Sequence, residues 1–405
     1  MTRAAYQSPG PAQGQGGGRV PAREVLERVR RFQERLAGRG AAGALVTGRT
    51  DRYYLTGTAQ EGSLWVPSQG DPVLWVLRDP GRAARETPLP VEPVAAGRDL
   101  WARARRAVGQ GLPGIVADVF PAAWLGRLGL DGARPWVDVS PDLLEVRRRK
   151  SPWEVERMAA AAAVAARVYE HAAEVLRPGM TEAELGGLLF ARAMALGHEG
   201  FLASRGPFQA YSWHVVAGAG TLEPGAVDTP MPGTGRSPAF PVGAGDRPIR
   251  RGEPVVVDFG ISVWGYQTDQ TRTLCVGSPP EWLREAHAAL LEVHRAVEAR
   301  LAPGTTAGEV FRTGAEAAAA AGLGGYLGPE GRRCRFVGHG VGLETVEPPI
   351  LAEGSPEALR EGDTLAVEPK AVVAGLGGVG VEDTYVLGPE GPRRLTAMSR
   401  DLVAC

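Results

Sequence analysis

The sequence has little of what secreted disulfide proteins, membrane proteins and nucleic-acid-binding proteins require. It contains only three cysteines, unclustered along the chain, which excludes a disulfide framework and a cysteine-based zinc site and favours the cytoplasm. Its longest aliphatic run, Met158 to Ala166, is far shorter than the ~20 residues of a membrane span. Its 45 basic and 46 acidic residues nearly cancel, so no overall field attracts nucleic acid or an anionic membrane. We therefore expect a soluble protein with a small substrate.

The N-terminal third shows helix-like and strand-like patterns in alternation. Residues 1–20 are rich in Gly, Gln and Pro and have no apolar core, which predicts a disordered tail rather than a signal peptide. A helix is predicted from Ala22 until the glycines at 38 and 40, followed by strands at 44–47 and 72–77. Together these patterns predict an α/β domain over residues 21–148.

A second domain is predicted over residues 149–405. Ser151, Pro152 and Glu154 supply an N-cap, a first-turn proline and an early acid for a long helix. The basic run Arg147–Lys150 just before it is interpreted as a solvated approach to this helix rather than a binding patch.

The first sign of chemistry is a pair of acids on a predicted hairpin, within EPVVVDFGISVWGYQTDQTRTLCVG. If the turn is centred between Val263 and Trp264, Asp258 and Asp269 are directly opposed on one face, with side chains ~5 Å apart. Carboxylates at that distance need a cation or a shared proton, and hard divalent metals prefer oxygen ligands.

A second predicted hairpin repeats this arrangement. Glu368 and Glu382 are symmetric about Gly375, so they too are expected to face each other. Between the hairpins, His339 is flanked by glycines, which we interpret as letting the backbone approach a ligand closely. Each residue alone is typical of a turn or loop, but the four acids and the imidazole together indicate a mixed nitrogen and oxygen metal site.

These motifs resemble the pita-bread metallopeptidases, a family that includes methionine aminopeptidases, prolidases and aminopeptidases P. The resemblance lies in the series DFG, GYxxDxTRT, GHGVGLE, VEP and VEDT and in its spacing, and the entry segment VRRRKSPWEVERM is similar to the creatinase and prolidase branch. It implies an α+β protein in which an N-terminal creatinase-like α/β domain precedes a pita-bread domain with a curved antiparallel sheet.

The resemblance also implies a dinuclear centre and its chemistry. Two divalent metal ions, manganese first and cobalt, zinc or iron otherwise, would be held by Asp258, Asp269, His339, Glu368 and Glu382. In this scheme Asp269 and Glu382 bridge the metals, and Glu368 is the catalytic proton shuttle. Water activated between the metals would attack the scissile carbonyl of a small peptide or amide. A homodimer is expected by the same resemblance.

The chain departs from the family in the residues that would hold a substrate. A histidine seven positions after the ligand histidine is replaced by Val346, and a second substrate histidine falls near Pro241. The family's arginine two positions before the last glutamate is Gly380. Losing one hydrogen-bond donor to an oxyanion commonly costs ~10²–10³ in rate. The substrate contacts we predict in compensation are at His214, Val346 and Glu347, with Glu344 as a further candidate.

Three functions remain open from the sequence. The first is an exopeptidase of Xaa-Pro aminopeptidase or dipeptidase type. The second is a hydrolase of a non-peptide C–N or amide substrate, and the third is a non-hydrolytic binding protein on the same scaffold. GLGGVG at Gly375–Gly380 matches a dinucleotide-binding fingerprint, but the strand-like sequence after it argues against that function.

The segment 219–251 is dense in Gly and Pro and too long for a routine connection. We interpret it as a lid or specificity loop, with a floppy insertion as the alternative.

Overall fold

The chain forms two compact units. The computed structural model describes residues 18–109, 111–132, 134–205, 214–223, 225 and 227–405, so most of the predicted tail at 1–20 lies outside the described residues. The N-terminal unit contains the described residues up to Arg147 together with Arg205. The C-terminal unit contains residues 148–204 and the described residues from His214 to the C-terminus. The predicted α+β fold is confirmed.

The N-terminal unit contains a mixed sheet whose order, among its described residues, is β4-β3-β2-β1-β5-β6. Its strands are β1 (Gly43–Val46), β2 (Gly62–Pro67), β3 (Val73–Val76), β4 (Val91–Pro93), β5 (Pro113–Ile115) and β6 (Val137–Asp138). Its helices are α1 (Ala22–Gly38), α2 (Arg49–Thr56), α3 (Pro80–Glu86), α4 (Gly97–Val108), α5 (Leu125–Leu128) and the 3-10 turns η1 (Ala117–Val119) and η2 (Ala122–Trp124). The first helix and the strands predicted near 44–47 and 72–77 are thereby confirmed. Aromatic side chains, including Trp65, Trp75 and Trp101, fill the core beside the sheet.

Helix α6 (Ser140–Arg148) leads into the C-terminal unit, which is built around antiparallel strands. One sheet has the order β17-β9-β8-β7 and contains β7 (His214–Ala217), β8 (Pro254–Val263), β9 (Tyr266–Cys275) and β17 (Val403–Ala404). A second has the order β11-β10-β12-β15-β16 and contains β10 (Phe336–Gly340), β11 (Glu347–Ala352), β12 (Thr364–Val367), β15 (Asp383–Gly388) and β16 (Gly391–Arg394). The hairpin of β13 (Lys370–Val373) and β14 (Gly377–Gly380) completes the set.

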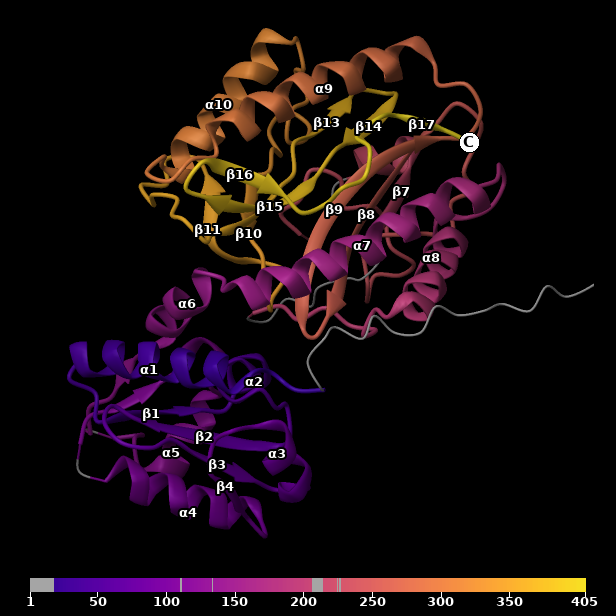
Figure 1. Cartoon of the computed structure of the whole chain (residues 1–405). Helices are drawn as coiled ribbons and strands as arrows, with labels where there is room; N and C mark the ends of the chain where they lie inside the picture. The colour runs from indigo at the N-terminus through magenta and orange to yellow at the C-terminus, as the bar shows by residue number, and fades with distance from the viewer. Residues whose placement is uncertain (1–17, 110, 133, 206–213, 224, 226) are drawn as a thin grey trace, which may run out of the picture. The chain divides into compact units, whose positions relative to one another are not determined.

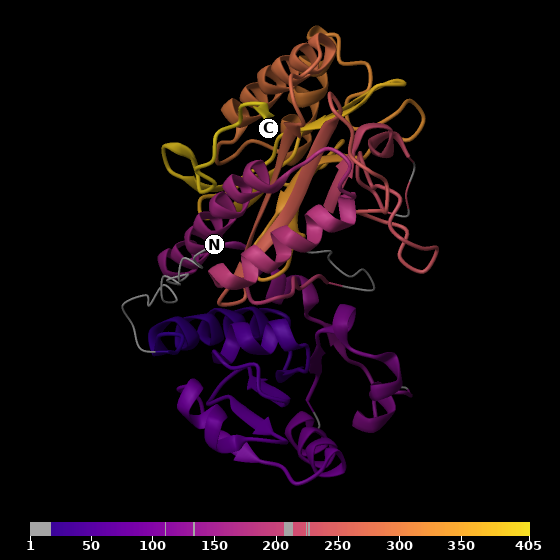
Figure 2. The same cartoon turned by 90° about the vertical axis from the view of Figure 1, so that its right-hand side faces the viewer.

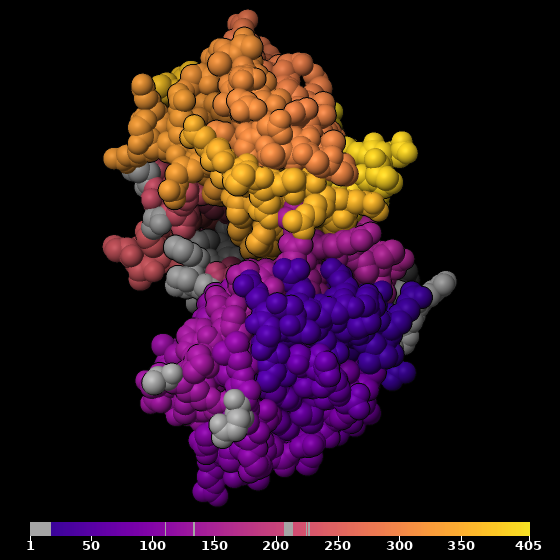
Figure 3. Space-filling model, turned by 90° about the vertical axis from the view of Figure 1, so that its left-hand side faces the viewer, coloured from indigo at the N-terminus to yellow at the C-terminus, as the bar shows by residue number. Residues whose placement is uncertain are grey.

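Helices cover these strands from two sides (Figures 1 and 2). Helices α7 (Pro152–Val175) and α8 (Glu182–Leu196) share a core with β7, β8 and β9. Helices α9 (Glu281–Arg300) and α10 (Ala307–Ala320) share another with β10, β11, β12 and β15. On the face shown in Figure 3, the segments after residue 280, coloured orange to yellow, form most of the surface of this unit. The remaining short helix is η3 (Gly218–Leu222).

The predicted start of the long helix α7 is confirmed in detail. The Ser151 hydroxyl oxygen accepts from the Glu154 backbone N–H, and the Glu154 carboxylate accepts from the Ser151 backbone N–H, at 3.3 and 2.7 Å. Pro152 occupies the first turn. This reciprocal capping box satisfies donors that a helix N-terminus otherwise leaves unpaired. Of the helices that the structure describes, none is both long and apolar enough to cross a membrane.

The interpretation of Arg147–Lys150 as a solvated run is wrong. Only Arg149 extends into solvent, with its side chain 67% exposed. Arg148 is buried and donates to both carboxylate oxygens of Asp363, each at 2.7 Å. Lys150 is buried against Glu347, with Nζ 2.9 Å from Oε2. These acidic partners lie about 200 positions further along the chain, so the local sequence carried no signal of burial.

We expect Arg148→Met to lower the free energy of unfolding of the C-terminal unit by about 3–5 kcal/mol, because Asp363 would remain buried without its ion-pair partner. Arg149→Met is the matched control, since it removes the same charge from the exposed neighbour. Chemical denaturation of the three proteins checks this. Equal stability of the two variants would contradict a structural role for the buried pair.

Candidate metal centre

The hairpin β8–β9 places Asp258 and Asp269 on one face, but not directly opposite each other. Asp258 pairs with Thr271, and Asp269 pairs with Gly260. The predicted register was therefore wrong by two residues. The turn is the pair Trp264–Gly265, whose positive φ angles of 56° and 74° are typical of a two-residue type I′ turn. A shift of two residues preserves the face, so the two acids lie diagonally across the hairpin.

The second predicted register is confirmed. Lys370 pairs with Gly380 in the β13–β14 ladder, and Val367 pairs with Asp383 in the β12–β15 ladder. Both pairings are symmetric about residue 375. Glu368 and Glu382 lie in the short gap between these two ladders, so they face each other as expected.

His339 lies on β10, the neighbour of β12. Its flanking glycines are required by strand packing, and their predicted role in ligand approach stays a prediction. A methyl group at Gly338 would collide with the Ala366 carbonyl oxygen, and one at Gly340 would collide with the Pro348 carbonyl oxygen. Glycine at both positions therefore lets β10 lie close to the strands on either side.

Threonines join the two pairs of acids. The Glu382 backbone N–H donates to the Thr271 carbonyl oxygen at 3.0 Å, and the Thr271 hydroxyl donates to Glu382 Oε2 at 2.7 Å. The Asp269 backbone N–H donates to the Thr384 hydroxyl oxygen at 3.0 Å, and that hydroxyl donates to the Asp269 carbonyl oxygen at 2.8 Å. These bonds hold β9 beside β15 and beside Glu382, which directly precedes β15. The sequence motifs contained these threonines, but their role depends on which strands are neighbours.

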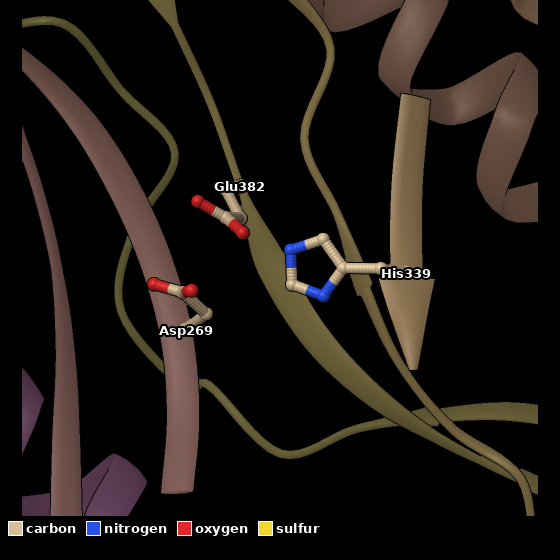
Figure 4. A group of neighbouring side chains, drawn as sticks. All are labelled: Asp269, His339 and Glu382. Carbon is tan, nitrogen blue, oxygen red and sulfur yellow. The ribbon is translucent and has the colours of Figure 1, made fainter. Parts of the chain in front are cut away.

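All five predicted ligands lie in two overlapping groups. Potential ligand atoms of Asp269, His339 and Glu382 lie within 4.8 Å of one another, and Figure 4 shows these side chains pointing toward a common centre. Atoms of Asp258, Glu368 and Glu382 form the other group within the same distance. Glu382 belongs to both groups, which is the arrangement expected of a ligand shared between two cation positions.

Lys370 ends inside the second group and was missed by the sequence analysis. Its Nζ donates to Asp258 Oδ2 at 2.7 Å and to Glu368 Oε2 at 2.6 Å, and lies 3.9 Å from Glu382 Oε2. Burial alone would lower the pKa of Lys370, but these carboxylates raise it well above its usual range. The signal was present, because a residue two positions after Glu368 lies on the same face of an extended chain.

The carboxylates are not equally acidic. Burial and the neighbouring Glu382 raise the pKa of Asp269 well above its usual range. Burial also raises the pKa of Glu382 to about 8, against the opposing effect of Lys370. Burial would raise the pKa of Glu368 as well, but Lys370 and His339 lower it to about 2. One ammonium group therefore does not offset the effect of burial on the pKa of Asp269 and Glu382, and a further cation beside them would lower both pKa values.

The donor set beside Asp269 fits a divalent metal. His339 Nδ1 lies 3.0 Å from the Gly340 carbonyl oxygen, and a carbonyl only accepts, so Nδ1 carries a proton. Nε2 is then the nitrogen directed at the acids, 3.4 Å from Glu368 Oε1. A ring N–H donated to a backbone carbonyl is the usual support of a metal-binding histidine. Asp269 and Glu382 add the oxygen ligands that complete a mixed site.

His214 lies at the edge of the cluster, directly opposite Asp258 in the β7–β8 ladder. Its Nε2 is 2.6 Å from the Met231 carbonyl oxygen, so Nε2 donates and, in the neutral ring, Nδ1 is left as an acceptor. Burial lowers the pKa of His214, with Asp258 opposing the shift, and this favours the neutral ring. A neutral Nδ1 suits a substrate N–H group rather than an oxyanion.

The other predicted substrate residues differ in exposure. Val346 is 45% exposed, whereas Glu347 is 2% exposed and bound by Lys150. Glu344 is also buried. Pro241 is exposed and presents no hydrogen-bond donor at the position of the second family histidine. A role for Val346, Glu344 or Glu347 in substrate binding stays a prediction.

The described part of segment 219–251 is anchored to the C-terminal unit. The Glu182 carboxylate of α8 accepts from the backbone N–H groups of Ala217 and Gly245, at 2.8 and 2.9 Å. Met231 is buried with Val256 and Val372, which belong to β8 and β13. This segment, coloured rose in Figure 2, therefore brings the Met231 carbonyl to His214.

The glycine-rich sequence 375–380 forms a hairpin turn and strand β14 rather than the start of a helix. The structure thus confirms the argument against a dinucleotide-binding motif, because no helix N-terminus follows these glycines to receive a pyrophosphate.

Comparison with known proteins gives two matching family models. Residues 156–389 match metallopeptidase family M24, and residues 28–148 match the creatinase/prolidase N-terminal domain. The Xaa-Pro dipeptidase of Pyrococcus furiosus is 40% identical over 172 residues, 42% of this chain and about half of that protein (47%). The probable dipeptidase PepE of Mycobacterium bovis is 28% identical over 403 residues, 96% of this chain and 98% of that protein.

Solved structures resemble the whole chain. The prolidase from Pyrococcus horikoshii OT3 is similar with a TM-score of 0.78 and 25% sequence identity. The similarity covers 93% of this chain and 100% of that chain. The chain therefore has the fold of this prolidase, with the two units in the same order along the sequence.

We expect Gly380→Ala to destabilise the protein by about 1–3 kcal/mol, because the added methyl group would press on Thr271 Cγ2 and Lys370 Cγ. Gly187→Ala is the matched control. Gly187 is exposed on α8 with open space around it, so alanine there should stabilise by about 0.5–1 kcal/mol. Thermal unfolding of both variants checks the sign of each change, and a neutral Gly380→Ala would contradict the tight packing beside Lys370.

Proposed function

The chain belongs to metallopeptidase family M24, and we propose that it is a metal-dependent exopeptidase of Xaa-Pro aminopeptidase or dipeptidase type that acts on short peptides. The observation that carries this proposal is the convergence of Asp258, Asp269, His339, Glu368 and Glu382 in one buried cluster. The similarity to an Xaa-Pro dipeptidase supports the substrate class.

Within this proposal, the divalent metal would be held by the predicted ligands Asp258, Asp269, His339, Glu368 and Glu382. Among them, Asp269, His339 and Glu382 would form the mixed nitrogen and oxygen site, and oxygen-rich ligation favours manganese over cobalt, zinc or iron. A metal bound there would polarise a substrate carbonyl and lower the pKa of a bound water. Glu368 is ionised and lies beside His339, so it can accept a proton during the reaction and return it to the leaving amine. His214 Nδ1 would accept from a substrate N–H group.

The family resemblance also supports a homodimer. The three cysteines are not joined in disulfides, which supports the reducing cytoplasm as the compartment. Sedimentation velocity of the purified protein distinguishes a dimer from a monomer.

Val346 favours a second candidate function, the hydrolysis of a small non-peptide amide or C–N bond. The family resemblance implies an imidazole at this position, and the chain presents an exposed aliphatic side chain instead. An apolar contact there would suit a substrate group that makes no hydrogen bond. Segment 219–251, which carries Met231 and Pro241, is proposed as the specificity loop in either case.

The manganese-loaded protein should release amino acids from Xaa-Pro dipeptides and from longer Xaa-Pro peptides faster than from matched Xaa-Ala peptides. Asp269→Asn should lower kcat/KM by on the order of 10³-fold, because metal chemistry contributes several kcal/mol. Asp401→Asn is the control, since Asp401 is an exposed acid on the same unit. Amino-acid release measured by mass spectrometry checks all three proteins.

Two outcomes would redirect the proposal. Hydrolysis of small amides without cleavage of any Xaa-Pro peptide would select the second candidate. Failure to bind any divalent metal would defeat both hydrolase functions and leave the binding-protein alternative.

His214→Ala should lower kcat/KM by about 10²-fold for substrates with a free amino group, because one buried hydrogen-bond partner of the substrate is lost. The effect should be much smaller for substrates whose amino group is acetylated. His171→Ala serves as the control. His171 lies on α7, and its Nδ1 is 3.2 Å from Glu174 Oε2. Equal losses for free and acetylated substrates would contradict a contact between His214 and the substrate amine.

A further inference from the structure

Lys370 places its ammonium among the three acids Asp258, Glu368 and Glu382, one of the two groups of possible ligands in the centre. Its Nζ contacts Asp258 Oδ2 and Glu368 Oε2 at 2.7 and 2.6 Å and lies 3.9 Å from Glu382 Oε2. These are the three acids that form the group without a histidine. The Lys370 side chain is only 2% exposed, so its charge is not directed at solvent.

An ammonium at this point excludes a divalent metal from the same oxygens. Metal–oxygen bonds to carboxylates measure ~2.0–2.2 Å, so a metal bound to Asp258 Oδ2 and Glu368 Oε2 would lie next to Nζ. Two cations that close, in a buried site, repel each other strongly. The group that contains the histidine, with Asp269, His339 and Glu382, has the donors of a mixed metal site and does not contain this ammonium.

The strand pairing holds Lys370 in place. Gly380 lies directly opposite it in the β13–β14 ladder, and a methyl group at Gly380 would meet Lys370 Cγ. The lysine stem thus fills the space that a side chain at residue 380 would take. The family resemblance implies an arginine at residue 380, so this chain carries its positive charge on the opposite strand.

The choice of residue supports a role for a compact ammonium. The chain has only two lysines, Lys150 and Lys370, and every other basic residue is arginine. Both lysines are buried against carboxylates. An ammonium is a point charge with three donors, which suits three converging acids, whereas a guanidinium is a planar fork suited to one.

We propose that Lys370 is a built-in cation that takes the place of one of the two metals, so that each chain binds a single divalent ion at Asp269, His339 and Glu382. This inference rests on the proposed metal-dependent function. Unlike a metal, the ammonium has no open coordination position for water or a substrate carbonyl. The centre would therefore act with one electrophilic metal position and one fixed positive charge that holds Asp258 and Glu368.

The test is the number of manganese ions bound per chain, measured by elemental mass spectrometry after loading and desalting, together with the electron paramagnetic resonance spectrum. The wild type should bind one ion and give the six-line spectrum of isolated manganese. Lys370→Met should bind two ions and show the spectrum of an exchange-coupled pair. Lys370→Arg, which keeps the charge, should still bind one.

Ligand variants separate the two groups. Asp258→Asn should retain the single ion, because Asp258 contacts Lys370 rather than the metal in this arrangement, and Asp269→Asn should lose it. Two ions per wild-type chain, or loss of the ion in Asp258→Asn, would overturn the inference while leaving the metal-dependent function intact. No metal in the wild type would overturn the proposed function together with the inference. The wild-type count is decisive even if Lys370→Met does not fold.

Discussion

The mutual repulsion of four clustered carboxylates, three of them buried, is the constraint on which the C-terminal unit depends. Asp258, Asp269, Glu368 and Glu382 converge from two hairpins, where burial limits the screening of their charges by water. Such a cluster is stable only when cations or shared protons lie among the acids. Lys370 supplies one positive charge from the chain itself, and the donors around Asp269 suit a divalent metal as the other.

The strand registers and a few hydrogen bonds resist this repulsion. The β8–β9 and β13–β14 ladders fix the backbone on either side of the acids, and Thr271 and Thr384 tie the two hairpins together. Gly380 leaves space for the Lys370 stem. The strand pairing that brings the acids together therefore also places the Lys370 ammonium beside Asp258 and Glu368 and leaves the position beside Asp269 for a metal.

The substrate region has changed more than the metal ligands. Val346 and Pro241 occupy positions where the family resemblance implies histidines, while His214 stays beside Asp258 and is oriented by the Met231 carbonyl. Substrate binding here would depend on His214 Nδ1 as a hydrogen-bond acceptor and on the apolar side chain of Val346, rather than on histidines that donate hydrogen bonds. Membership of family M24 therefore does not identify the substrate, which depends on His214, Val346 and Pro241.

The sequence by itself determined the helix start at Ser151, the family and the convergence of the five predicted ligands, because capping, strand alternation and motif spacing can be identified along the chain. It placed Asp258 and Asp269 on the correct face but in the wrong register, since the turn lies at Trp264–Gly265 rather than at Val263–Trp264. Only the tertiary structure decided that Arg148 and Lys150 are buried and that Lys370 lies among the acids. The acids that bind Arg148 and Lys150 lie about 200 positions further along the chain, and Asp258 lies 112 positions from Lys370, so local patterns do not encode these contacts. Only Glu368, two positions before Lys370, gave a local signal.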